Sequence, residues 1–97
     1  MRRADAIGRL ERLLPELRER FGVRSLTLFG STARDEAGED SDVDVVVDLG
    51  PQPAFRKVVA VVDALEAELG AHVDVLTPGA VRPRLQRHIV SDGVRIA

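Results

Sequence analysis

The segment from residue 42 to residue 49 reads DVDVVVDL, and it constrains the fold of this chain more than any other stretch. Its richness in valine predicts a β-strand. Side chains of a strand alternate between its two faces, so the valines at odd positions share one face and Asp42 and Asp44 share the other. A carboxylate at the start of a buried strand is costly unless a partner or a cation compensates its charge. The segment therefore predicts a sheet with one apolar face and an acidic site at the end of the other.

A second segment, HVDVLT at residues 72–77, repeats this arrangement. Its valines share one face of a predicted strand and Asp74 takes the opposite face. If the two strands are neighbours and their valines face the same helices, Asp74 joins Asp42 and Asp44. Three converging carboxylates suit Mg²⁺, which takes oxygen ligands, keeps waters and accepts phosphate oxygens.

Apolar spacing, glycines and prolines predict the other elements. The expected helices cover residues 3–13, 15–21, 31–37, 54–69 and 83–90, and the expected strands cover 23–29, 42–49, 71–77 and 94–96. Pro15 is expected to end the first helix and to open the second. The expected buried stripe of helix 54–69 is Phe55, Val58, Val59, Val62, Leu65 and Leu69. This order indicates an α/β (α+β) fold, a small mixed sheet of three to four strands flanked by helices.

Composition limits the class of protein. The 97 residues predict a single domain, 1–97, and the absence of Cys excludes disulfides and zinc–thiolate sites. The net charge of −2 predicts no direct binding to nucleic acid. No apolar run reaches membrane-spanning length, so we expect a cytoplasmic protein without membrane contact.

Gly30 and Ser31 follow the predicted strand 23–29 and precede a predicted short helix. In such a turn Gly lets the backbone approach a phosphate, Ser offers a hydroxyl and the helix start presents free N–H groups. A lone Gly-Ser is usually only a turn, and a lone Asp-x-Asp is usually solvated. An EF-hand loop is excluded, because Val45 and Pro51 stand where that loop requires Gly and Glu.

The combination is more specific than its parts. Gly30-Ser31, ten further residues and Asp42-Val43-Asp44 form the GSx10DxD pattern. With the context LFGSTAR, DSDVDVVVD and VDVLTPGAVRPRL, residues 15–92 resemble the minimal nucleotidyltransferase (MNT) branch of the DNA polymerase β-like nucleotidyltransferase superfamily.

The resemblance implies a role for each matching position. Gly30 and Ser31 would hold the β- and γ-phosphates of a nucleoside triphosphate. Asp42 and Asp44 would ligate Mg²⁺, and Asp74 would complete a second metal site and help activate the acceptor hydroxyl. Catalysis would then be mostly positioning and charge neutralisation.

Two nearby residues carry alternatives. Arg34 would touch the triphosphate or the acceptor, or would instead form a surface salt bridge with an acidic neighbour. Asp35 departs from the Gly that many relatives have after the Arg, and its charge is expected to weaken nucleotide binding. His72 shares the face of Asp74, where it could hydrogen-bond near the site, and is expected to be a surface residue at a strand start.

The resemblance also implies a partner. Larger relatives carry a helical domain that holds the acceptor, and this chain has no room for one. MNT proteins resemble antitoxins that pair with HEPN RNase toxins and transfer AMP from ATP to a toxin tyrosine, which predicts a hetero-oligomer. The chain has no Tyr, so it cannot modify its own tyrosine. The alternatives are a degenerate antitoxin that acts by binding alone and a small-molecule nucleotidyltransferase. The spacing of Arg82 and His88 only superficially resembles a HEPN RNase motif.

Overall fold

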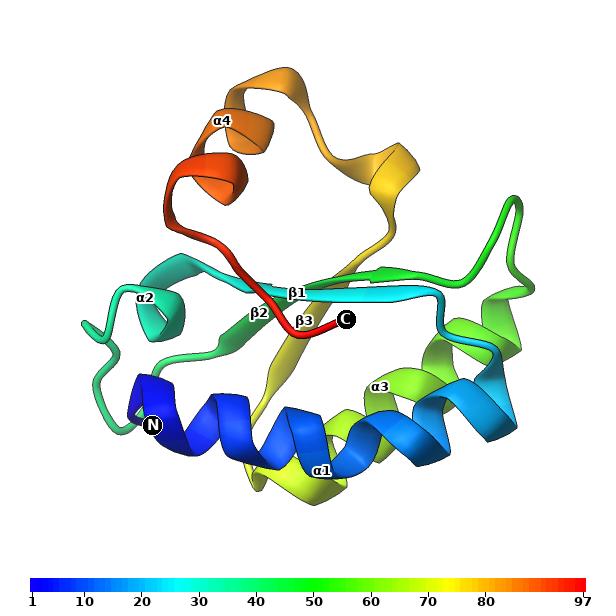
Figure 1. The fold of residues 1–97 in the computed structure, drawn as a ribbon, viewed down its shortest axis with the longest axis horizontal. Coiled ribbons are helices and arrows are strands. Elements are labelled where there is room, and N and C mark those ends of the chain that lie inside the picture. The colour runs from blue at the N-terminus through cyan, green and yellow to red at the C-terminus, as the bar shows by residue number, and fades with distance from the viewer.

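The computed structural model describes all 97 residues. Helices and strands alternate along the chain (Figure 1). Their order is α1 (Arg3–Phe21), β1 (Ser25–Phe29), α2 (Gly30–Ala33), β2 (Val43–Asp48), α3 (Phe55–Leu69), β3 (Val73–Leu76), the 3-10 turn η1 (Pro78–Ala80), α4 (Pro83–Asp92) and β4 (Val94–Arg95).

The strands form one sheet in the order β3-β2-β1-β4. β1 pairs antiparallel with β2 and with β4, whereas β2 and β3 pair in parallel across the α3 crossover. The sheet is therefore mixed, as the sequence predicted. The short edge strand expected at residues 94–96 is confirmed as β4.

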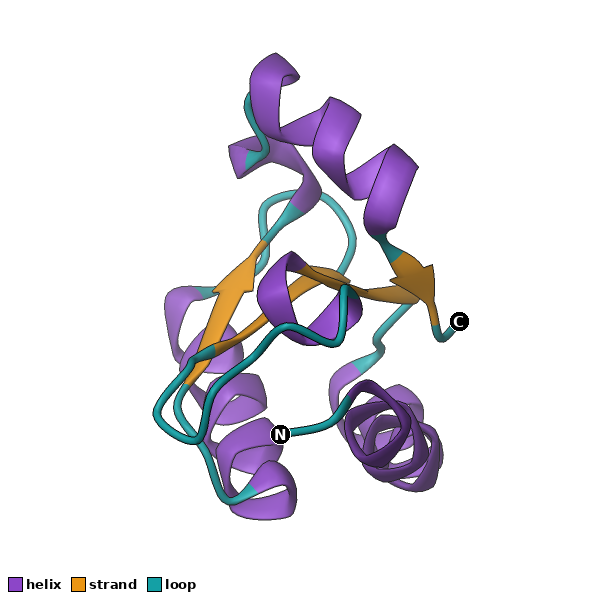
Figure 2. Cartoon of the chain, turned by 90° about the vertical axis from the view of Figure 1, so that its left-hand side faces the viewer, coloured by secondary structure: helices purple, strands orange, loops and turns teal.

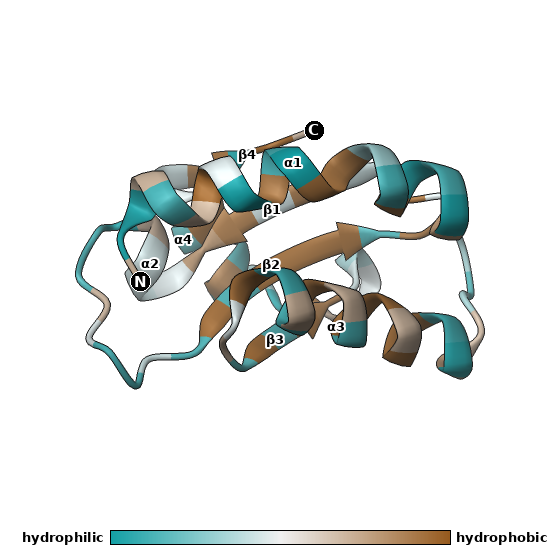
Figure 3. Cartoon of the chain, turned by 90° about the horizontal axis from the view of Figure 1, so that it is seen from below, coloured by the Kyte–Doolittle hydropathy of each residue, from teal (hydrophilic) through white to brown (hydrophobic).

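Helices cover the two faces of the sheet unequally (Figures 1 and 2). α1 and α3 lie together on one face, and Val43, Val45 and Val47 of β2 are fully buried beneath them. Figure 3, seen from the side of these two helices, shows the apolar strands behind them. α4 lies on the other face, where it buries no residue completely, and its apolar residues Leu85 and Ile89 are only half-buried. No helix combines the length and apolarity needed to span a membrane.

The predicted break at Pro15 is wrong, because α1 runs through it without interruption. Proline in a helix removes one backbone hydrogen bond and costs about 3 kcal/mol. Pro15 and Glu11 are both exposed, so solvent can hydrate the carbonyl that loses its partner. Each buried Leu contributes roughly 1.5–3 kcal/mol. Leucines on both sides of the proline are buried, which outweighs its cost: Leu10, Leu13, Leu14 and Leu17.

The predicted buried stripe of α3 is only partly right. Leu65 and Leu69 are buried together with Val61, whereas Phe55 is 83% exposed and Val59 is 41% exposed. α3 is apolar around more than one face, so the spacing of its residues does not determine which face is covered. Its packing against α1 and β3 selects the face of Val61.

Candidate active site

The carboxylates lie where β2 and β3 begin, on the sheet face opposite α1 and α3. The parallel register pairs Asp44 with Asp74, and Val43 with Val73. The valines of this register are buried, whereas Asp44 is half-buried and Asp42 and Asp74 are exposed. The structure thus brings the three carboxylates from two neighbouring strands to one end of the open face.

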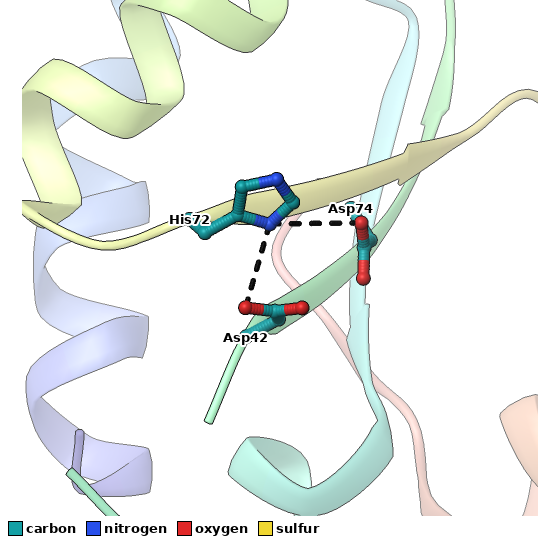
Figure 4. Close-up of side chains that lie close together, drawn as sticks. All are labelled: Asp42, His72 and Asp74. Atoms are coloured by element: carbon teal, nitrogen blue, oxygen red, sulfur yellow. Dashed lines mark ion pairs between the residues drawn. The ribbon is translucent and has the colours of Figure 1, made fainter. Parts of the chain in front are cut away.

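An imidazole completes this cluster. His72 Nδ1 lies 3.4 Å from Asp42 Oδ1 and 3.7 Å from Asp74 Oδ1 (Figure 4). One ligand atom from each of these three side chains lies within 4.8 Å of the others. His72 is therefore part of the site, although its place at a strand start predicted only a solvated residue. Its position two residues before Asp74 was the available signal, but only the β2–β3 register places it beside Asp42.

The charge of the cluster acts on Asp44. Burial raises the pKa of the Asp44 carboxyl above its ordinary value, and the negative charges of Asp74 and Asp42 raise it further. Arg34 lowers the pKa of Asp44 and so offsets part of this effect. The surroundings of Asp44 therefore disfavour its ionised form, as expected of a carboxylate at a cation-binding site.

Gly30 connects the start of α2 to the acidic cluster. Its φ of +74° lies in the left-handed region that favours glycine. A Cβ at this position would collide with a carboxylate oxygen of Asp44 and would lie 3.2 Å from Asp44 Cγ. The backbone of Gly30 and the side chain of Asp44 are thus in close contact. Ser31, the next residue, is half-buried in the first turn of α2.

α2 is shorter than the predicted helix 31–37, because it ends at Ala33. Arg34 follows it, and Arg34 Nε lies 3.1 Å from Glu36 Oε2. The surface salt bridge that was one of the two expectations for Arg34 is therefore present. Because Arg34 also lowers the pKa of Asp44, its charge acts on the site as well.

Asp35 follows α2 in the sequence and caps the N-terminus of α1. Its φ of +58° is left-handed, which explains why a Gly is suited to this position. The backbone N–H of Arg3 donates a 2.9 Å hydrogen bond to Asp35 Oδ1, whereas the N-cap residue Arg2 makes no side-chain cap. The Asp35 carboxylate is thus directed at the N-terminus of α1, where a negative charge is favourable.

The family is shown by comparison of the sequence with known proteins. The model of the nucleotidyltransferase domain matches residues 10–96. The chain belongs to the nucleotidyltransferase family. The family predicted from Gly30-Ser31 and Asp42-Val43-Asp44 is therefore confirmed.

Relatives within this family are similar over most of their length. The chain is 41% identical to the protein adenylyltransferase MntA of Thermococcus cleftensis over 84% of this chain and 82% of that protein. A solved structure provisionally described as a minimal nucleotidyltransferase is 32% identical, with a TM-score of 0.80 and coverage of 97% of this chain and 95% of the other.

A more distant solved structure shares the fold alone. It is the complex of a tri-AMPylated HEPN toxin with an MNT antitoxin from Shewanella oneidensis, and its matching chain is 18% identical. The TM-score is 0.65, and the match covers 90% of this chain and 68% of the other.

Proposed function

We propose that this nucleotidyltransferase is an antitoxin that transfers AMP from ATP to a tyrosine hydroxyl of a HEPN RNase toxin and thereby silences it. The observation that carries the proposal is the meeting of three carboxylates with the Gly30-Ser31 turn on one open sheet face. The adenylyltransferase named among the relatives supports AMP as the transferred group.

The donor set fits divalent cations. Asp42, Asp44 and Asp74 supply only oxygen atoms, which Mg²⁺ prefers. The pKa of Asp44 is raised by its burial and then by the negative charges of Asp74 and Asp42, and a bound cation would offset both effects. We propose that these three residues hold two Mg²⁺ ions. When bound, such ions neutralise the triphosphate and stabilise the charge of the leaving group.

The residues of the chain position the substrates. Gly30 allows the backbone to approach the β- and γ-phosphates, and Ser31 offers its hydroxyl to them. Arg34 would exchange its exposed partner Glu36 for a phosphate oxygen. This binding would hold the α-phosphorus in line with the acceptor oxygen, and positioning of this kind supplies a large share of the rate enhancement.

Asp74 is the proposed proton acceptor. It lies on β3, the edge strand of the sheet, and its side chain is exposed. The acceptor hydroxyl gives its proton to the Asp74 carboxylate, its oxygen forms a bond to the α-phosphorus, and the bond from this phosphorus to the β-phosphate oxygen breaks. Pyrophosphate leaves with the electron pair of that bond.

The acceptor belongs to a second protein in this proposal. The chain contains no Tyr, so a tyrosine acceptor must come from another protein. The Shewanella oneidensis complex pairs an MNT antitoxin with an AMPylated HEPN toxin. By analogy, we propose a hetero-oligomer in which the toxin presents its hydroxyl to Asp74.

Two alternatives make different predictions. A degenerate antitoxin would silence the toxin by contact alone, and the complete set of three carboxylates argues against it. A small-molecule nucleotidyltransferase would need its acceptor held by some other subunit.

The test is the intact mass of a cognate toxin co-expressed with the chain. We expect a mass increase in AMP-sized steps on a tyrosine with wild type, and none with Asp74→Asn even though the two proteins still bind. Asp63→Asn, on the exposed side of α3, is the matched control and should leave the increase unchanged. A toxin silenced equally by wild type and Asp74→Asn, without any change in mass, would leave binding alone as the mechanism.

A further inference from the structure

His72 lies where a metal ligand would be expected, and the family pattern of carboxylates assigns it no role. Its Nδ1 is 3.4 Å from an Asp42 oxygen and 3.7 Å from an Asp74 oxygen. Two atoms that each lie about 2.1 Å from one metal ion are about 3.0 Å apart at a right angle and about 3.4 Å apart at the tetrahedral angle. The three side chains therefore need only small adjustments to share an ion.

The backbone around His72 is fixed on both sides. Its carbonyl accepts a 2.9 Å hydrogen bond from the N–H of Val43, and the N–H of Val73 donates a 3.0 Å hydrogen bond to Glu66 Oε2 on α3. The register also places His72 across from Asp42, as Asp74 lies across from Asp44. The backbone consequently directs the imidazole toward the two carboxylates, although its side chain is 63% exposed.

Imidazole changes the chemistry of such a site. Mg²⁺ takes oxygen ligands almost exclusively, whereas imidazole nitrogen suits first-row transition metals, and affinity at such sites rises from Mn²⁺ through the later members of the series. A site of two carboxylates and one imidazole is therefore biased away from Mg²⁺.

We propose that His72 is a metal ligand together with Asp42 and Asp74, and that this position takes a divalent first-row transition metal in preference to Mg²⁺. The inference deepens the proposed function, on which it rests, by replacing Mg²⁺ with a transition metal at the second of the two proposed cation positions. The position shared by Asp42 and Asp44 remains an all-oxygen site.

The other explanation is that His72 merely pairs with the carboxylates when it is protonated. In that case it competes with any cation, because both occupy the same negative charge. Removal of the side chain would then raise the affinity for Mg²⁺ and Mn²⁺ alike. The two explanations thus predict opposite changes.

The test measures Mn²⁺ and Mg²⁺ binding to the untagged chain at fixed pH, by the electron paramagnetic resonance signal of free Mn²⁺ and by its displacement with Mg²⁺. The chain has two histidines, so His88→Ala on exposed α4 is the matched control. We expect His72→Ala to weaken Mn²⁺ binding at least about tenfold and to change Mg²⁺ binding less than about twofold. His88→Ala should change neither.

A spectroscopic measurement tests the bond itself. Mn²⁺ bound to wild type should show electron spin-echo modulation from a coordinated nitrogen, and His72→Asn, which places an amide near the same position, should remove it. An unchanged ratio of Mn²⁺ to Mg²⁺ affinity in His72→Ala, or the lack of nitrogen modulation in wild type, overturns this inference alone. Failure of wild type to bind either cation, with or without ATP, overturns it together with the proposed metal sites.

Discussion

Gly30→Ala should separate the stability of the fold from the integrity of the site. Gly30 has a φ of +74°, and an added Cβ would collide with the carboxylate of Asp44. The left-handed conformation costs a residue with a Cβ roughly 1–2 kcal/mol. The collision involves the far end of a side chain, so Asp44 can rotate away at little further cost to stability. That rotation removes Asp44 from the cluster with Asp42 and Asp74.

Gly70→Ala is the control for this substitution. Gly70 has a similar φ of +63°, but no atom lies within 4 Å of the position of its Cβ. Both variants should lose about the same stability, and about 1–2 kcal/mol corresponds to roughly 4–15 °C in the melting temperature of a domain of this size. The two variants therefore differ only in their effect on Asp44.

The assay is thermal unfolding with and without Mg²⁺ and ATP. Ligands that bind only the folded state raise its free energy of unfolding by mass action, by about 2.7 kcal/mol at one hundred times the dissociation constant. The melting temperature rises accordingly. Wild type and Gly70→Ala should show this rise, and Gly30→Ala should show little or none. A rise of normal size in Gly30→Ala would refute the inference that Gly30 is needed to keep Asp44 in place.

Three further substitutions test other parts of the site. Asp44→Asn should raise the melting temperature of the metal-free chain at neutral pH and abolish the rise caused by Mg²⁺ and ATP. Because folding raises the pKa of Asp44, metal-free wild type should lose stability as pH rises through that pKa, and Asp44→Asn should lose less. Asp35→Ala removes the cap of α1 and should cost about 1 kcal/mol in urea unfolding, whereas Asp35→Asn should cost less; equal losses would argue against the cap. Arg34→Ala should weaken ATP binding roughly tenfold by calorimetry and leave binding of Mn²⁺ alone near normal, and equal weakening of both would place Arg34 at the metal instead.

The predictable part of the fold came from short-range patterns. The alternation of DVDVVVDL defines both the strand and the face of Asp42 and Asp44 without any tertiary information. The continuity of α1 through Pro15 was not predictable in this way, because it depends on leucines buried against the sheet and α3. The exposure of Phe55 likewise depends on where α3 meets its neighbours.

The site shows the same division. Asp42 and Asp44 belong to one strand, whereas the proximity of Asp74 required the assumption that β3 lies beside β2 with its valines facing the same way. The position of His72 required the register to within one residue, because a shift of one residue would turn its side chain to the other face. The hydrogen bond from the Arg3 N–H to Asp35 was not predictable from local pattern, because the two residues are 32 positions apart in the sequence.

The two helices beneath the sheet also hold the two halves of the site above it. Asp35, at the end of α2, is bound to the first turn of α1, so α1 fixes the segment that follows Gly30 and Ser31. Glu66 of α3 accepts the N–H of Val73, so α3 fixes the start of β3 that carries His72 and Asp74. Since α1 and α3 pack against each other, a displacement of either helix would change the distance between the Gly30-Ser31 turn and the acidic cluster. The core on one face thus positions the carboxylates on the other.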